Sequence, residues 1–115
     1  MKNTTYINNK FINHNKAKIS VDDRGFLFAD SVYELICVLN KKIIDLDQHL
    51  NRLKVSLKKV KIKYKLNKKK FEEIINKIIK LNKIFNGYVY IQITRGVAER
   101  KHEFPDKYHP STIIF

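Results

Sequence analysis

The stretch from residue 46 to residue 94 reads LDQHLNRLKVSLKKVKIKYKLNKKKFEEIINKIIKLNKIFNGYVYIQIT. In its first part, apolar side chains recur at steps of four and three residues, the spacing of one helical face, at Leu46, Leu50, Leu53, Leu57 and Val60. After Asn67 a second such face follows at Phe71, Ile74, Ile75, Ile78, Ile79 and Leu81. Asn86-Gly87 is a stop signal, because glycine is favoured just past a helix end. The alternation over residues 88–94 then predicts a strand.

Short strands are predicted near the start of the chain. Residues 5–7 and 10–12 are apolar runs separated by Asn8-Asn9, and asparagine tolerates the positive φ of a tight hairpin. Residues 18–21 are a further candidate extended segment, and residues 22–25 have the composition of a turn. We therefore expect an N-terminal hairpin followed by a less regular connection.

A longer strand is predicted over residues 32–39, where β-branched and apolar residues dominate, and we expect it to be buried. Asp45 or Asp47 can cap the helix that follows. Strands, two consecutive helices and strands again predict an α+β fold, in which a mainly antiparallel sheet packs against the two helices. At 115 residues the chain is long enough for one such domain.

The formal net charge of +13 is the strongest feature of the composition. Twelve lysines lie between Lys54 and Lys83, against only Glu72 and Glu73. A nucleic-acid surface is one interpretation. However, the segment contains no arginine, which forms the forked contacts to phosphates and base edges, and no spaced aromatics for base stacking. We therefore favour a solvated basic surface and do not expect nucleic-acid binding.

Other classes of protein are disfavoured by the composition. No apolar run approaches the about 20 residues of a membrane span, and the N-terminus has no secretory signal. The four histidines and Cys37 lack the close ligand spacings of a zinc site, so we expect no metal. A single cysteine cannot form an internal disulfide, which suits the cytoplasm.

Three places are candidates for chemistry. Tyr33 and Glu34 stand at the head of the apolar strand, where burial of a phenol and a carboxylate without partners would destabilise the fold. The plainer interpretation is that both lie at the solvated end of the strand. Arg52 is the one guanidinium of the first predicted helix, and by default a surface ion-pair residue. Arg100 and His102 would point to one side of an extended segment and could grip a carboxylate. A solvated loop is the plainer interpretation of that last pair.

Three strings occur at these places, in the order DDRGFLFADSVYE (22–34), DQHLNRL (47–53) and TRGVAERKHEFP (94–105). Together they resemble the class IV pyridoxal-phosphate aminotransferases, in particular the D-amino-acid (D-alanine) type. TYINNKFI (5–12) and YVYIQITRG (88–96) are also similar to that family, so the resemblance covers essentially the whole chain. Ala29 and Ser31 depart from it, because many members have glycines around this aspartate.

The resemblance implies roles for the candidate residues. Arg52 matches the arginine that binds the phosphate of the pyridoxal 5′-phosphate cofactor, and Tyr33 matches the tyrosine at the substrate carboxylate. Arg100 and His102 match the pair that completes the carboxylate site from the partner subunit of a homodimer. Glu34 matches an acid near the active site. Branched-chain aminotransferases and aminodeoxychorismate lyases share the fold, and they remain alternatives.

The resemblance also implies that part of the enzyme lies outside this chain. The family's Schiff-base lysine and the rest of its cofactor site lie in a second domain, beyond residue 115, so no catalytic residue is assigned here. The apolar strand at residues 112–115 is shorter than the usual five or six residues and looks cut. We expect residues 1–115 to be an N-terminal domain that is inactive alone and needs a C-terminal domain polypeptide. A basic nucleic-acid-binding module and a remnant without function are the alternatives.

Overall fold

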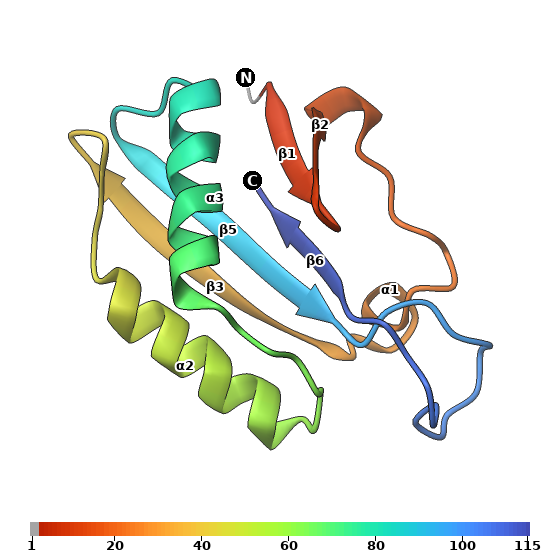
Figure 1. Ribbon diagram of the computed structural model, residues 1–115. Coiled ribbons are helices and arrows are strands. Elements are labelled where there is room, and N and C mark those ends of the chain that lie inside the picture. The colour runs from red at the N-terminus through yellow and green to blue at the C-terminus, as the bar shows by residue number, and fades with distance from the viewer. Residues whose placement is uncertain (1–2) are drawn as a thin grey trace.

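The computed structural model describes residues 3–115, which form one six-stranded sheet with helices on one face (Figure 1). The strands lie in the order β2-β1-β6-β5-β3-β4, and every neighbouring pair is antiparallel. Their bounds are β1 Thr4–Ile7, β2 Lys10–Asn13, β3 Ser31–Leu39, β4 Lys42–Ile43, β5 Gly87–Thr94 and β6 Ser111–Ile114. The predicted α+β architecture is confirmed.

The N-terminal hairpin is built on its two asparagines. Asn8 and Asn9 take φ angles of 45° and 70°, which asparagine tolerates better than most residues. Residues 18–21, the further candidate extended segment, form no strand of the sheet. After β2 the chain forms a 3₁₀ turn, His14–Lys16, and then runs without regular structure to Ser20. This segment pairs with no strand among the described residues, so it has no ladder to hold it extended.

The last strand in sequence lies inside the sheet. β6 is inserted between β1 and β5, and Figure 1 shows it beside both. The Asn8 N–H donates to the Thr112 carbonyl over 3.0 Å, and the Thr112 N–H donates to Asn8 Oδ1 over 2.8 Å. Ile114 is fully buried. The predicted terminal strand is therefore a core strand that joins the hairpin to the rest of the sheet.

Both long helices, α2 (Leu46–Lys59) and α3 (Lys68–Leu81), cover the same face of the sheet (Figure 1). Their predicted apolar faces supply most of the helical part of the core, through Leu50, Leu53, Leu57, Phe71, Ile74, Ile75, Ile78 and Ile79. Val60 and Leu81, predicted at the ends of these faces, are partly exposed. The helical spacing thus identified the buried faces of both helices, but it extended each face to a residue that is not buried, Val60 and Leu81.

The second helix ends earlier than Asn86-Gly87. Its C-terminal cap is Asn82, whose Oδ1 accepts hydrogen bonds of 2.8 Å from the backbone N–H groups of Asn3 and Thr4. The Asn82 Nδ2 donates to the Thr4 carbonyl over 2.9 Å. Lys83 then takes a φ of 51°, which turns the chain out of the helix. A contact with β1 therefore stabilises this helix end, and local sequence could not reveal it.

Strand β3 has two different faces. Val32, Glu34, Ile36 and Val38 are buried beneath the helices, whereas Tyr33, Leu35 and Leu39 are 64%, 48% and 50% exposed on the other face. The prediction of a buried strand was therefore wrong for alternate residues, because the helices cover only one side of the sheet. Apolar residues occupy both faces of β3, so the sequence alone does not reveal which face lacks a covering layer.

Candidate functional site

Glu34 on β3 and Arg52 on α2 form a forked ion pair. Glu34 is only 2% exposed, and its Oε1 accepts from Arg52 Nε over 2.6 Å while its Oε2 accepts from Arg52 Nη2 over 2.7 Å. His49 Nδ1 lies 2.8 Å from the same Oε2. His49 and Arg52 are three residues apart, so they lie on one face of the helix. Because α2 packs on β3, this face meets the one carboxylate of the strand.

Arg52 keeps part of its hydrogen-bonding capacity for a ligand. Glu34 takes the Nε–Nη2 edge of the guanidinium, and Nη1 makes no hydrogen bond within residues 3–115. The side chain is 68% exposed, beside a hollow of about 310 Å³ that is also lined by Asp45, Gln48 and His49. A guanidinium with a free edge in an open hollow can bind an anion such as a phosphate.

The start of α2 borders the same hollow. Asp45 occupies the N-terminal cap position, which was one of the two predicted, but its φ of 54° is left-handed and its side chain makes no capping hydrogen bond. The carboxylate instead lines the hollow. The residue type thus predicted where the helix starts, but the capping hydrogen bond that it implied is not formed.

Tyr33 lies on the opposite face of β3 from Glu34. Its ring stacks on Tyr90 of β5, with ring centroids 5.7 Å apart and planes 18° apart. Around residue 33, β3 is the edge of the sheet, because β4 pairs only with Val38 and Leu39. Tyr33 also contributes electrostatically to raising the pKa of Arg52, after the larger effects of Glu34. The phenol therefore lies on the face of the sheet that α2 does not cover, opposite the face that carries the Glu34–Arg52 pair.

Arg100 and His102 lie in the loop between β5 and β6, and both contact the ring of Phe28. The Arg100 guanidinium carbon is 5.3 Å from the ring centroid, and the His102 ring centroid is 5.4 Å from it. Phe28 ends the short helix α1, Arg24–Phe28, whose first two residues belong to the turn predicted at residues 22–25. Because both contact Phe28, the two side chains share one side of the loop. Both are exposed, so they remain accessible to a ligand or to another chain.

A buried charge cluster at the base of this loop was not identified from the sequence. Asp30 accepts from Arg24 Nε over 2.8 Å and from Arg95 Nε over 2.6 Å, and the exposed fractions of the two arginines are 3% and 2%. Arg24 Nη1 donates to the Lys101 carbonyl over 2.7 Å. The Phe104 ring packs on the cluster, with its centroid 4.0 Å from the Arg95 guanidinium carbon and 5.7 Å from that of Arg24.

This cluster joins three parts of the chain. Arg95 also donates to the carbonyls of Val60 and Lys61, over 2.9 and 3.0 Å, so the loop after α2 is fixed as well. Its members lie inside the first and third candidate strings, in which the sequence analysis assigned roles only to Tyr33, Glu34, Arg100 and His102. The sequence carried one indication of the cluster, because a carboxylate and two arginines flank apolar strands that would bury them.

The carboxylates of Asp30 and Glu34 are held in the ionised form. Burial alone would raise the pKa of Asp30, but hydrogen bonds from Arg95 and Arg24 and their charges lower it overall. Burial likewise opposes ionisation of Glu34, and the hydrogen bonds and charges of Arg52 and His49 outweigh it, so that this pKa is also lowered. At neutral pH both clusters are therefore ion pairs.

These pKa shifts predict a loss of stability in acid. Because folding lowers both pKa values, their contribution is complete above the unfolded pKa of about 4 and is lost as the pH falls through the lower folded values. We expect thermal melts to give a constant melting temperature between about pH 7 and 5 and a steep fall below about pH 4. Glu34→Gln should reduce this acid loss, and an unchanged pH profile in that variant would contradict the assignment.

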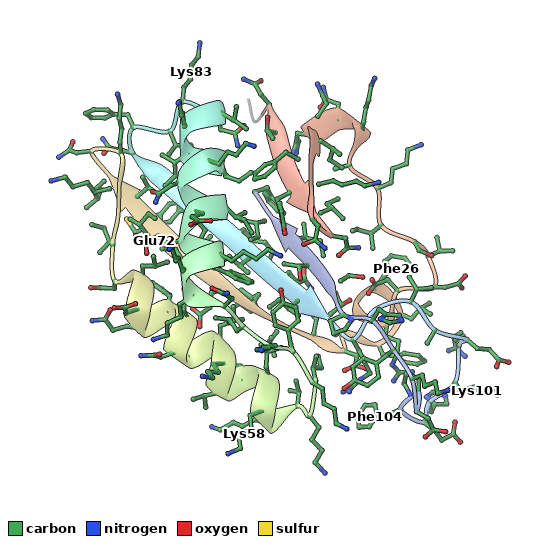
Figure 2. The ribbon with its side chains drawn as sticks, in the orientation of Figure 1. Phe26, Lys58, Glu72, Lys83, Lys101 and Phe104 are labelled. Atoms are coloured by element: carbon green, nitrogen blue, oxygen red, sulfur yellow. The ribbon has the colours of Figure 1, made fainter. Side chains whose placement is uncertain are left out.

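The lysines are spread over the helical layer as solvated side chains. All twelve between Lys54 and Lys83 are exposed, and Figure 2 shows Lys58 and Lys83 extending away from the body. Residues 3–115 contain no cluster of histidine, cysteine and carboxylate side chains that could hold a metal ion. Within the same residues, no helix is long and apolar enough to cross a membrane.

Comparisons with known proteins agree with this geometry. A model of the amino-transferase class IV family matches residues 31–115. The D-alanine aminotransferase of Staphylococcus haemolyticus is 37% identical over 100 residues, which are 87% of this chain and 36% of that relative. A solved branched-chain amino acid aminotransferase from Escherichia coli gives a TM-score of 0.91 at 20% identity, covering 99% of this chain and 40% of that one. The branched-chain enzyme from T.th., complexed with N-(5′-phosphopyridoxyl)-L-glutamate, gives 0.85 at 20% identity with the same coverage. The chain thus spans little more than a third of the length of these relatives.

Proposed function

The chain belongs to the class IV aminotransferase family, and from this membership we propose that it is the N-terminal domain of a D-amino-acid aminotransferase. The reaction would transfer an amino group between a D-amino acid, of the D-alanine class, and a 2-oxo acid. The observation that carries the proposal is the 37% identity to D-alanine aminotransferase over 87% of the chain. The branched-chain structures are only 20% identical, so they support the fold and leave the branched-chain reaction as the alternative.

The proposed cofactor is pyridoxal 5′-phosphate, and the chain offers one group suited to its phosphate. Arg52 is permanently charged, has a free Nη1 and opens on a hollow large enough for a phosphate monoester. When bound, the cofactor would act as the electron sink for the carbanion formed at the substrate Cα. Arg52 would hold the phosphate and so fix the position of the cofactor relative to the substrate.

The substrate carboxylate would be held by Tyr33, Arg100 and His102. Arg100 can donate a forked pair of charge-assisted hydrogen bonds, while the phenol and the imidazole add single bonds. The two loop residues share a contact with Phe28 and are exposed, which supports their serving a site outside their own domain. We propose that this site belongs to the partner subunit of a cytoplasmic homodimer.

The amine that forms the Schiff base would come from a C-terminal domain outside these residues. The test is to co-express this chain with the C-terminal domain of a D-alanine aminotransferase and to purify the complex. We expect the complex to convert D-alanine to pyruvate in a reaction that depends on an added 2-oxo acid. The chain alone, assayed in parallel, should form no product above background.

Two outcomes would redirect the proposal. A folded complex that binds the cofactor and turns over no amino acid would exclude an aminotransferase assembled from this domain. Turnover of L-leucine or L-valine without turnover of D-alanine would replace the D-amino-acid reaction with the branched-chain one. Running the same assay with Arg100→Ala would test the carboxylate site, because loss of this contact should raise KM for D-alanine more than it lowers kcat.

A further inference from the structure

The Arg52 side chain is fixed along one edge by a buried acceptor. Its Nε and Nη2 both donate to Glu34, which is only 2% exposed, whereas Arg52 itself is 68% exposed. A planar guanidinium has two forked edges, and occupation of the Nε–Nη2 edge leaves the Nη1–Nη2 edge for a second acceptor. The geometry therefore separates a structural edge from a binding edge.

We propose that Glu34 is a positioning residue, which holds the Arg52 guanidinium so that its second edge receives a phosphate monoester. The inference rests on the proposed function, in which Arg52 binds the cofactor phosphate. Glu34 itself would not contact the phosphate. It would act by fixing the direction and the rotamer of Arg52 before the ligand arrives.

An exposed arginine needs such an anchor. A free side chain of this length samples many rotamers, and part of that freedom is lost when it closes on a ligand. Glu34 is held by β3, its Oε1 accepts from Arg52 Nε, and its Oε2 contacts both Arg52 Nη2 and His49 Nδ1, so both oxygens of the anchor are in use. The ordering of Arg52 is therefore completed during folding rather than during binding.

Local charge alone would not make this a good anion site. The positive charge of Arg52 is opposed by Glu34 and by Asp45, which lines the same hollow. A carboxylate so near to a bound phosphate repels it, so simple electrostatics predicts that removal of the Glu34 charge strengthens binding. Positioning predicts the opposite sign, and the two explanations can therefore be separated by one substitution.

The test measures binding of pyridoxamine 5′-phosphate to the purified complex of this chain with the C-terminal domain by NMR, following the ¹⁵Nε–¹H signal of Arg52. This probe carries the phosphate but no aldehyde, so it does not react with the many lysines. We expect Glu34→Gln to weaken binding about tenfold, as loss of a charge-assisted hydrogen bond would. Glu72→Gln, the same change at an exposed position on α3 (Figure 2), should leave the affinity unaltered.

Two further measurements separate positioning from loss of structure. Glu34→Asp keeps the charge but shortens the side chain, so weaker binding in that variant reports geometry even if Glu34→Gln fails to fold. Binding of pyridoxamine, which lacks the phosphate, should be equal in the wild type and in both variants. A broadened or shifted Arg52 Nε signal in the absence of ligand should accompany the loss of affinity.

The outcomes distinguish this inference from the proposed function. If Arg52→Lys weakens binding of the phosphate probe while Glu34→Gln and Glu34→Asp leave it equal or tighter, the positioning role is overturned and the phosphate site stands. If the wild type and Arg52→Lys bind equally, or if the wild type does not bind, Arg52 is no phosphate ligand and both proposals fall.

Discussion

Replacing Asp30 with asparagine is expected to lower the free energy of unfolding by about 3–5 kcal/mol, the usual cost of removing one partner from a buried ion pair. The substitution keeps the size of the side chain but removes the only charge that compensates Arg24 and Arg95 in the described cluster. Both guanidiniums would then remain buried without a counter-ion. Since small domains are stable by about 5–15 kcal/mol, this loss would leave a marginal fold.

The measurement is urea denaturation followed by circular dichroism. Asp22→Asn is the matched control, because Asp22 is exposed, lies in the same segment and undergoes the same change in charge. Its free energy of unfolding should stay within about 0.5 kcal/mol of the wild type. If the Asp30 and Asp22 variants differ by less than about 1 kcal/mol, the cluster is not a major source of stability.

Gly96→Ala is expected to cost about 3 kcal/mol or more. Gly96 has a φ of 99°, a conformation strained for any residue with a Cβ atom, and the added atom would overlap the backbone carbonyl oxygen of His109. The residue also links the loop to α1, because its carbonyl accepts from the Arg24 N–H over 2.9 Å. Relief of the overlap would require the loop to move as a whole.

The same denaturation series should include Gly87→Ala. At that position the new atom would meet only the Ile84 Cγ2, a side-chain atom 3.3 Å away, and no left-handed φ is required. We expect a change of about 1 kcal/mol at most. Equal losses in the two variants would show that the backbone of Gly96 is more adaptable than its φ and its neighbours indicate.

The main elements of the fold could be predicted because their determinants are local. The spacing of Leu50, Leu53 and Leu57 identifies a helical face without knowledge of what it packs against. The ends of these elements depend on distant partners. The second helix ends where Asn82 meets β1. The open face of β3 has no helical layer among the described residues. Neither feature is encoded in the flanking residues.

The candidate site was predictable in composition and less so in geometry. Arg52 was interpreted from its sequence as a surface ion-pair residue and from resemblance as a phosphate ligand, and the structure adds that its ion-pair partner is Glu34. The pairing joins a strand to a helix 18 residues away, so it follows from packing rather than from spacing. Asp30 and its two arginines were missed because Arg95 lies 65 residues from Asp30, so the cluster also follows from packing.

The central place of β6 also governs the order in which the molecule can be assembled during synthesis. The hairpin leaves the ribosome first, yet the strand that pairs with β1 comes last, and the Thr112–Asn8 hydrogen bond joins residues 104 positions apart. At about 5–20 residues per second, the hairpin waits roughly 5–20 seconds for its neighbour. Throughout that interval one edge of β1 is unpaired, and an unpaired strand edge can pair with another chain until β6 has emerged to cover it.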